Sequence, residues 1–145
     1  LTKKNYGIIK ILKQIDERFV IYGFDIEKKE KNLFYHKTGD NFLNDLGKCK
    51  AIIATSGFTL ISEAIYLKKP YFAIPLKGQF EQVFNSLILK NSGFGDYSED
   101  PSKESLTSFL KKIKKYEKSL KTYKFDDKLL FKTLDLVLKK IENGK

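Results

Sequence analysis

Residues 51–75 read AIIATSGFTLISEAIYLKKPYFAIP, and they show an alternation of strand and helix. The apolar run Ile52–Ala54 predicts a short strand that is covered on both faces, as strands of a parallel sheet are. A turn and a helix that ends near Leu67 follow, and the break before Pro70 leads into a second strand, Phe72–Ile74. Strand, helix and strand in this order predict a right-handed βαβ unit with parallel strands.

The segment before this unit continues the alternation. An amphipathic helix is predicted from apolar residues at helical spacing, namely Ile8, Ile11, Leu12 and Ile15. Compact apolar runs predict strands at Phe19–Tyr22 and Leu33–Tyr35, and the charged residues 28–32 between them predict a solvated turn. Asp40 is the expected N-cap of a short helix that carries Phe42, Leu43 and Leu46.

The segment after the unit is predicted to be mostly helical. One helix is expected from about Glu81 to Asn91, with Gly93 ending it. Its apolar residues are expected in the core, and they are Phe80, Val83, Phe84, Leu87 and Ile88. Asp100 and Pro101 predict the N-cap and first turn of another helix. The last helix is expected to carry Leu130, Leu134, Val137, Leu138 and Ile141.

The fold class expected from this order is α/β, a Rossmann-like parallel sheet with helices on both faces. The 145 residues form one domain of ordinary size. The chain opens on a helix, whereas such sheets begin with a strand, normally a central one, that feeds this helix. We therefore expect residues 1–145 to be a fragment of a longer chain.

Composition limits the partners and the compartment. The net charge of +10 favours an anionic partner, although Arg18 is the only arginine, which argues against sequence-specific nucleic-acid binding. Non-specific binding of nucleic acid through lysines stays a weaker alternative. No apolar run is long enough to cross a bilayer, and a single cysteine, Cys49, fits a reducing cytoplasm.

Three polar clusters are expected beyond the carboxyl ends of the strands, where parallel sheets bind ligands. They are His36–Gly39, Thr55–Thr59 and Lys77–Gln82. In the second cluster, Gly57 permits close backbone approach and the following helix start offers free amides to phosphate. The other interpretation of this cluster is an ordinary capped turn.

Glu63 lies one helical turn beyond Thr59 on the same face, so its carboxylate could accept hydrogen bonds from a ribose diol. A solvated surface glutamate is the alternative interpretation. Gln79, Glu81 and Gln82 suit sugar hydroxyls. One His, His36, cannot supply a Ser-His-Asp set, so no catalytic residue is assigned. No paired-aspartate metal motif is evident, and no cofactor or metal is expected.

Residues 55–95 (TSGFTLISEAIYLKKPYFAIPLKGQFEQVFNSLILKNSGFG) resemble the carboxyl-terminal half of GT-B glycosyltransferases, and within them the family 28 transferases. The matching elements are Ser56-Gly57, Thr59, Ser62-Glu63-Ala64, Lys69-Pro70, Pro75, Glu81-Gln82 and Asn85. Two positions depart from the family pattern. Ser56 replaces the first glycine of the usual pair, and Glu81 stands where some members have Gln.

This resemblance implies the donor-binding half of a metal-independent glycosyltransferase that transfers a hexose or related sugar from a UDP-sugar to a glycan or lipid. The site would comprise Ser56, Gly57, Phe58 and Thr59 at the diphosphate, Glu63 at the ribose, Gln79, Glu81 and Gln82 at the sugar, and His36 near the base. The acceptor domain is absent from residues 1–145, so we expect this fragment alone to be inactive.

A second function of the same fold stays open. The chain could be a non-catalytic nucleotide-binding subunit that partners a membrane-bound acceptor subunit. Expected partners are thus a UDP-sugar, an amino-terminal acceptor domain and an acceptor at a membrane surface, and not a specific nucleic acid. The expected location is the cytoplasm, with the inner face of the membrane included.

Overall fold

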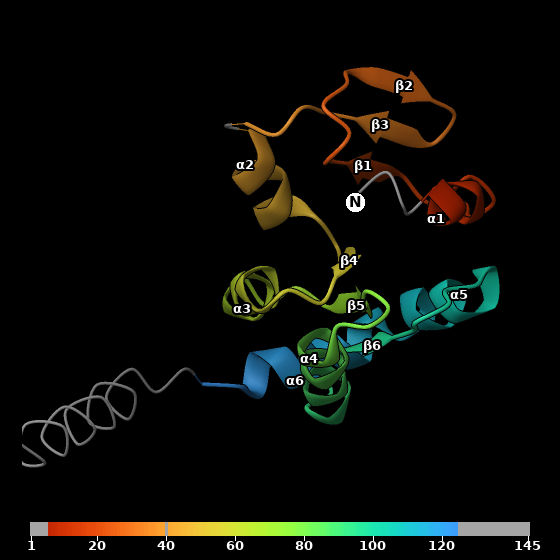
Figure 1. Cartoon of the computed structure of the whole chain (residues 1–145). Helices are drawn as coiled ribbons and strands as arrows, with labels where there is room; N and C mark the ends of the chain where they lie inside the picture. The colour runs from red at the N-terminus through yellow and green to blue at the C-terminus, as the bar shows by residue number, and fades with distance from the viewer. Residues whose placement is uncertain (1–5, 40, 125–145) are drawn as a thin grey trace, which may run out of the picture.

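The structure, a computed structural model, describes residues 6–39 and 41–124 (Figure 1). The helices are α1 (Tyr6–Leu12), α2 (Asn41–Lys48), α3 (Phe58–Tyr66), α4 (Phe80–Asn91), α5 (Lys103–Lys111) and α6 (Ile113–Thr122). The strands are β1 (Phe19–Ile21), β2 (Lys28–Glu30), β3 (Leu33–Tyr35), β4 (Ile52–Thr55), β5 (Tyr71–Ile74) and β6 (Gly95–Tyr97). The predicted Asp40 cap and the last helix, with Leu130–Ile141, lie outside the described residues.

The strands form two three-stranded sheets, with the orders β1-β3-β2 and β4-β5-β6. The second sheet is parallel throughout, since β5 pairs with β4 and β6 in the same direction. In the first sheet β1 and β3 are parallel and β2 is antiparallel to β3. All four predicted strands are present within a residue of their expected bounds, and the α/β fold class is confirmed.

The prediction that the charged residues 28–32 form only a solvated turn was wrong. Lys28–Glu30 pair with Leu33–Tyr35 as an antiparallel edge strand. The strand is short and charged, which are the properties that keep an exposed edge from pairing with another chain. Side chains add to this pairing, because Lys13 forms an ion pair with Glu30 and the Lys29 ammonium lies 5.0 Å from the centre of the Phe34 ring.

The start of α5 also differs from the prediction. The N-cap is Ser102, not Asp100, and Pro101 precedes the helix. The Ser102 hydroxyl accepts from the Ser105 amide while the Ser105 hydroxyl accepts from the Ser102 amide. This reciprocal pair satisfies two amides at the helix start, whereas an aspartate cap would satisfy one.

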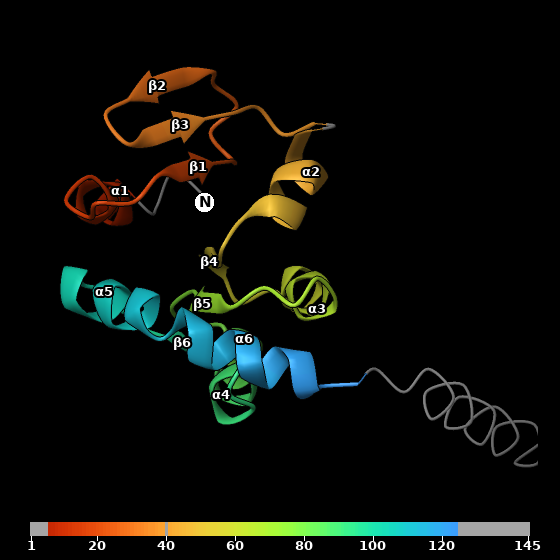
Figure 2. The same cartoon turned by 180° about the vertical axis from the view of Figure 1, so that it is seen from behind.

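Helices cover both faces of the second sheet, as expected (Figure 2). The side chains of Tyr71 and Ala73 on β5 belong to a core cluster with α3 and α4. Those of Phe72 and Ile74 belong to another cluster, which includes α1 and α5. Because this cluster also contains Leu33 of the first sheet, one apolar core joins the two sheets.

The prediction that the apolar residues of α4 lie in the core was wrong for most of them. The exposed fractions are 82% for Phe80, 52% for Phe84, 40% for Leu87 and 49% for Ile88. The residues that α4 buries are Ser86 and Leu89. The helix therefore turns a serine toward the sheet and its phenylalanines toward solvent.

Candidate functional site

The turn after β4 is fastened to its neighbours through its own backbone carbonyls. The Tyr71 hydroxyl donates to the Thr55 carbonyl at 2.6 Å, and the Asn85 amide donates to the Ser56 carbonyl at 3.1 Å. Burial raises the pKa of Tyr71, so this hydroxyl keeps its proton and stays a donor. The turn is thus held in place from β5 and from α4.

The Ser56 side chain is fully buried and faces α4. Its hydroxyl oxygen lies 2.7 Å from that of Ser86, which in turn lies 2.8 Å from the Gln82 carbonyl oxygen. Ser86 has one proton and the carbonyl can only accept, so Ser86 donates to Gln82 and Ser56 donates to Ser86. The hydroxyl of Ser56 is consequently used inside the protein and positions the turn.

Gly57 is the N-cap of α3, with φ −64° and ψ 135°. No side chain caps this helix start, and its first turn contains no acidic residue. A Cβ placed on Gly57 would meet nothing within 4 Å, so the space in front of the backbone is open. Uncapped amides and the positive end of the helix dipole suit this opening to an anion.

Two side chains flank the α3 helix start on its exposed side. Thr59 is exposed and Phe58 is 68% exposed. Glu63, one turn further along the helix, is half-buried, and its carboxylate forms no hydrogen bond or ion pair within residues 6–39 and 41–124. Its carboxylate therefore retains its full capacity to accept hydrogen bonds.

The loop after β5 is ordered by Gln82. The Gln82 side-chain oxygen accepts from the Leu76 amide at 3.1 Å, and its nitrogen donates to the side-chain oxygen of Gln79. Gly78 turns the loop with a φ of 80°, a conformation that favours glycine. Glu81 and Gln79 are exposed. Gln82 thus supports the loop, while its two neighbours face solvent.

His36 lies in the first sheet, at the carboxyl end of β3. Its Nδ1 is 2.9 Å from Glu27 Oε2, a contact that requires a proton on Nδ1, and the Lys37 amide donates to Glu27 Oε1 at 2.7 Å. The hydrogen bond from the Lys37 amide and, to a smaller extent, the one from His36 lower the pKa of the Glu27 carboxyl. No contact among the described residues joins His36 to the turn after β4. The structure therefore brings together two of the three predicted clusters.

Sequence reasoning missed two supports of the site, Tyr71 and Ser86. Each lies within an apolar run, where nothing in the pattern shows which polar atom will meet a backbone carbonyl. A third polar contact, between the Tyr22 hydroxyl and Asp45 at 2.6 Å, lies near the end of β1. Burial and, secondarily, Asp45 raise the pKa of Tyr22 to about 12.

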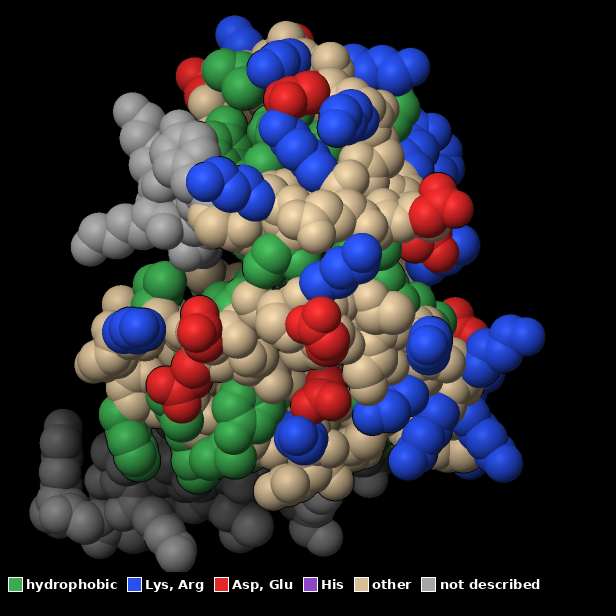
Figure 3. All heavy atoms as spheres, turned by 90° about the vertical axis from the view of Figure 1, so that its right-hand side faces the viewer, with side chains coloured by type: hydrophobic (Ala, Val, Ile, Leu, Met, Phe, Trp, Pro, Cys, Tyr) green, Lys and Arg blue, Asp and Glu red, His purple; other side chains and the backbone are tan. Residues whose placement is uncertain are grey.

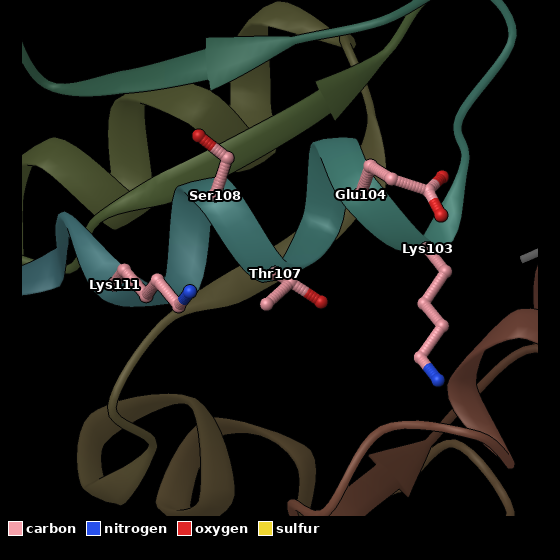
Figure 4. Close-up of a pocket in the computed structure, with 5 residues that line it drawn as sticks. All are labelled: Lys103, Glu104, Thr107, Ser108 and Lys111. Atoms are coloured by element: carbon pink, nitrogen blue, oxygen red, sulfur yellow. The ribbon is translucent and has the colours of Figure 1, made fainter.

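A surface cavity of about 450 Å³ lies elsewhere, along α5. It is lined by Lys103, Glu104, Thr107, Ser108 and Lys111 (Figure 4). Figure 4 shows Ser108 pointing away from the side on which Lys103 and Thr107 lie, so these groups do not converge on one point. The cavity is not connected with the turn after β4.

Among residues 6–39 and 41–124 no three His, Cys, Asp or Glu side chains lie close enough to hold a metal ion. None of the described helices has the length and apolar character needed to cross a bilayer.

The comparisons with solved structures agree with this geometry. The spinosyn forosaminyltransferase SpnP and the glycotransferase of kitacinnamycin each match with a TM-score of 0.66 and 13% identity over 81% of this chain. The glycosyltransferase SnogD from Streptomyces nogalater matches with a TM-score of 0.55 and 18% identity over 77%. The chain spans 33% of the length of each of these structures.

These matches show the fold, which is that of the carboxyl-terminal domain of GT-B glycosyltransferases. A search of curated protein sequences gave no significant match. The closer resemblance to family 28 stays a prediction. A family model, however, covers residues 1–114, and its description is glycosyl transferase family 1. The chain therefore belongs to glycosyl transferase family 1.

Proposed function

We propose that residues 1–145 form the donor-binding half of a metal-independent glycosyltransferase that uses a UDP-sugar. The diphosphate lies over Gly57 and receives the amides of Phe58 and Thr59, with the Thr59 hydroxyl as a further donor. Ser56 contributes by position, since its buried hydroxyl orients the turn. Backbone amides and a helix dipole supply the positive charge that a metal ion supplies elsewhere.

Glu63 binds the ribose diol in this proposal. It lies one turn from Thr59 on the same helix face, and its carboxylate has no partner among residues 6–39 and 41–124. Gln79 and Glu81 contact the sugar, and Gln82 holds their loop in place. His36 stands near the uracil base, a role that depends on the approach of the first sheet to the nucleotide. The transferred group is a hexose or related sugar.

The observation that carries the proposal is the bond network between the two strand ends. Asn85 and Ser86 on α4 bond to the turn after β4, and Ser86 also bonds to the Gln82 carbonyl, so in this proposal the phosphate-binding turn and the sugar-binding loop form one unit. An ordinary capped turn needs no such support, and this helix start has no side-chain cap. The open space at Gly57 faces the same edge of the sheet.

The acceptor, a glycan or a lipid, is expected to bind a further, amino-terminal domain. We therefore propose that residues 1–145 alone bind the donor without transferring its sugar. The protein acts in the cytoplasm or at the inner face of the membrane. The exposed apolar residues of α4 also favour a second candidate, a nucleotide-binding subunit that works with a membrane-bound acceptor subunit.

Calorimetric titration with a panel of UDP-sugars, UDP and AMP tests the proposal. We expect saturable binding of UDP and tighter binding of one or a few UDP-sugars, with little dependence on added magnesium. Binding of AMP as tightly as UDP, or of every polyanion with a steep salt dependence, would instead indicate a non-specific lysine surface. Binding that needs magnesium would contradict metal independence.

A further inference from the structure

The solvent face of α4 carries four large apolar side chains beside the exposed Glu81, Lys90 and Asn91, which is unusual for a helix at the surface of a domain. Phe80, Phe84, Leu87 and Ile88 are spaced i, i+4, i+7 and i+8, so they form one stripe on the side opposite the buried Ser86 and Leu89. The rings of Phe80 and Phe84 stack with centres 6.4 Å apart. A contiguous patch of this kind marks a binding surface.

The neighbouring helix α6 is basic. Six exposed lysines lie at the end of α5, in the turn that follows and on α6 itself: Lys111, Lys112, Lys114, Lys115, Lys118 and Lys121. Glu117 is the only acid on this helix. Within residues 6–39 and 41–124 none of the six ammonium groups has an acidic partner, whereas Lys13, Lys28, Lys50 and Lys90 have one.

The apolar stripe and the lysines lie on neighbouring helices. Leu89 of α4 and Leu120 of α6 belong to the same core cluster, and a Cβ on Gly93, just after α4, would lie 3.2 Å from the Ser119 hydroxyl on α6. Figure 3 shows hydrophobic side chains gathered at the lower left and Lys or Arg side chains at the lower right of one face of the molecule, with acidic side chains between them. We call the stripe together with the six lysines the α4–α6 surface.

We propose that the α4–α6 surface docks on an anionic membrane surface. Aromatic and aliphatic side chains enter the interface between headgroups and acyl chains, and flanking lysines bind anionic headgroups. The surface offers two phenylalanines and two aliphatic residues together with six cations that have no acidic partner within residues 6–39 and 41–124. The net charge of +10 acts in the same direction at longer range.

A membrane fits this surface better than a nucleic acid does. Nucleic-acid surfaces use arginine for bidentate contacts, and the only arginine, Arg18, already lies over the Phe34 ring in the first sheet. Phosphate contacts alone would also leave the stripe of Phe80, Phe84, Leu87 and Ile88 in water. A bilayer accounts for the lysines and for the stripe together.

The inference deepens the proposed function and rests on it in one respect. Phe80 begins α4 and follows Gln79 directly, so docking through the stripe brings the sugar-binding loop to the membrane surface. A membrane-borne lipid acceptor would then meet the donor sugar there. The docking itself can be tested without any nucleotide, which keeps the failure of one proposal distinct from the failure of the other.

The first test measures binding of the chain to vesicles by co-sedimentation. We expect binding to vesicles that contain 30% phosphatidylserine or phosphatidylglycerol, at least about tenfold tighter than to pure phosphatidylcholine. Binding should weaken as salt rises, yet part of it should persist at high salt because the apolar stripe is not screened. Equal binding to both kinds of vesicle, or no binding to either, would overturn the proposal.

The second test separates the two parts of the surface. The variant K114Q/K115Q/K118Q should bind anionic vesicles at least about tenfold more weakly and with a shallower salt dependence. The variant F84S/L87S should also bind more weakly, but with an unchanged salt dependence. Both variants should keep UDP binding, because neither changes the turn after β4 or the loop after β5.

Matched controls change the same chemistry elsewhere. K10Q/K31Q/K48Q removes three exposed lysines of the first half of the chain, and L43S/Y66S removes two exposed apolar side chains of α2 and α3. Both should retain binding within about twofold. If K10Q/K31Q/K48Q loses as much affinity for anionic vesicles as K114Q/K115Q/K118Q does, net charge alone drives adsorption and the α4–α6 surface is not the site.

Two other partners are outcomes that overturn the proposal. An RNA oligonucleotide that binds more tightly than the anionic vesicles, with no effect of F84S/L87S, would indicate a nucleic-acid surface. Concentration-dependent dimerisation in sedimentation velocity that F84S/L87S abolishes, without vesicle binding, would indicate that a second copy of the chain covers α4.

Discussion

Single polar side chains decide the geometry of the candidate site at the residue scale. Ser56 replaces a glycine of the family pattern, and the structure shows where the additional hydroxyl goes. It is buried and bonded to Ser86, which lies on the inward side of α4. A hydroxyl buried at this depth needs a partner, so a serine at position 56 and a serine at position 86 belong together.

Ser86→Ala should destabilise the domain by about 1–3 kcal/mol, because it leaves the buried Ser56 hydroxyl without its acceptor. The double variant Ser56→Ala/Ser86→Ala should be more stable than the sum of the two single variants implies, since it removes both partners. Urea denaturation of the four proteins measures this coupling. Additive single effects would show that the two hydroxyls do not depend on each other.

Glu63→Ala should weaken UDP binding about 10- to 100-fold. A hydrogen bond to a charged group contributes about 1.5–3 kcal/mol, which corresponds to that factor. The fold should be unaffected, because Glu63 has no partner in the described part of the chain and alanine is the better helix former. Calorimetry gives the affinity and thermal unfolding gives the control. Equal UDP affinity of the folded wild type and the folded variant would indicate that Glu63 is an ordinary surface residue of the helix.

At the scale of elements, the sequence predicted what periodicity and strong breaks encode. The four apolar strands, the helix between β4 and β5, and the end of α4 before Gly93 were found because runs of apolar residues and Gly or Pro signals agree there. β2 and β6 were missed. Each has three residues, one is charged and the other begins with glycine, so neither shows a strand pattern.

The orientation of α4 could not be predicted from the sequence. Half of the residues of this helix are apolar, and a buried-face rule assigns the apolar set to the core. The tertiary bonds of Ser86 and Asn85 to the turn after β4 instead hold the polar side inward. Such long-range pairs, 29 and 30 residues apart, leave no local signal. These two pairs also explain why the sequence could indicate candidate site residues but could not show that Ser86 supports the turn.

Gly95→Ala should disrupt the pairing of β6 with β5. A Cβ at this position would lie 1.8 Å from the Tyr71 carbonyl oxygen, and backbone atoms cannot move aside cheaply. We expect loss of the folded domain or a large fall in the urea midpoint. Gly57→Ala is the matched control, because its Cβ would meet no protein atom within 4 Å and its φ of −64° suits alanine. It should fold normally.

The same control variant, Gly57→Ala, carries a prediction of its own. Its added methyl group would point into the space that we assign to the diphosphate, so it should weaken UDP binding by at least about tenfold while the fold survives. Calorimetry beside circular dichroism separates the two effects. Unchanged UDP affinity in the folded variant would contradict the assignment of the diphosphate to the space in front of Gly57.

At the scale of the whole molecule, two sheets that share no hydrogen-bonded strand pair are joined by side chains alone. Leu33 of the first sheet, Ile8 and Leu12 of α1, and Phe72 of the second sheet belong to one cluster. A shared apolar core of this kind couples the unfolding of its parts. Strand polarity predicted that the polar clusters His36–Gly39, Thr55–Thr59 and Lys77–Gln82 lie on one edge. Which of these clusters meet depends on how the two sheets pack.

The last prediction concerns activity. The chain spans 33% of the length of the spinosyn forosaminyltransferase SpnP, and its candidate site contains the groups that we propose to bind the donor but no assigned catalytic base. Purified residues 1–145, given a UDP-sugar that they bind, should therefore release no more UDP than a buffer control over hours. Coupled detection of free UDP measures this directly. The Glu63→Ala variant, which should lose donor affinity, serves as the background, so slow release caused by a contaminant would appear equally in both proteins. Release by the unmodified chain that exceeds this background and rises with an added acceptor would show a complete active site within residues 1–145 and would refute the two-domain interpretation.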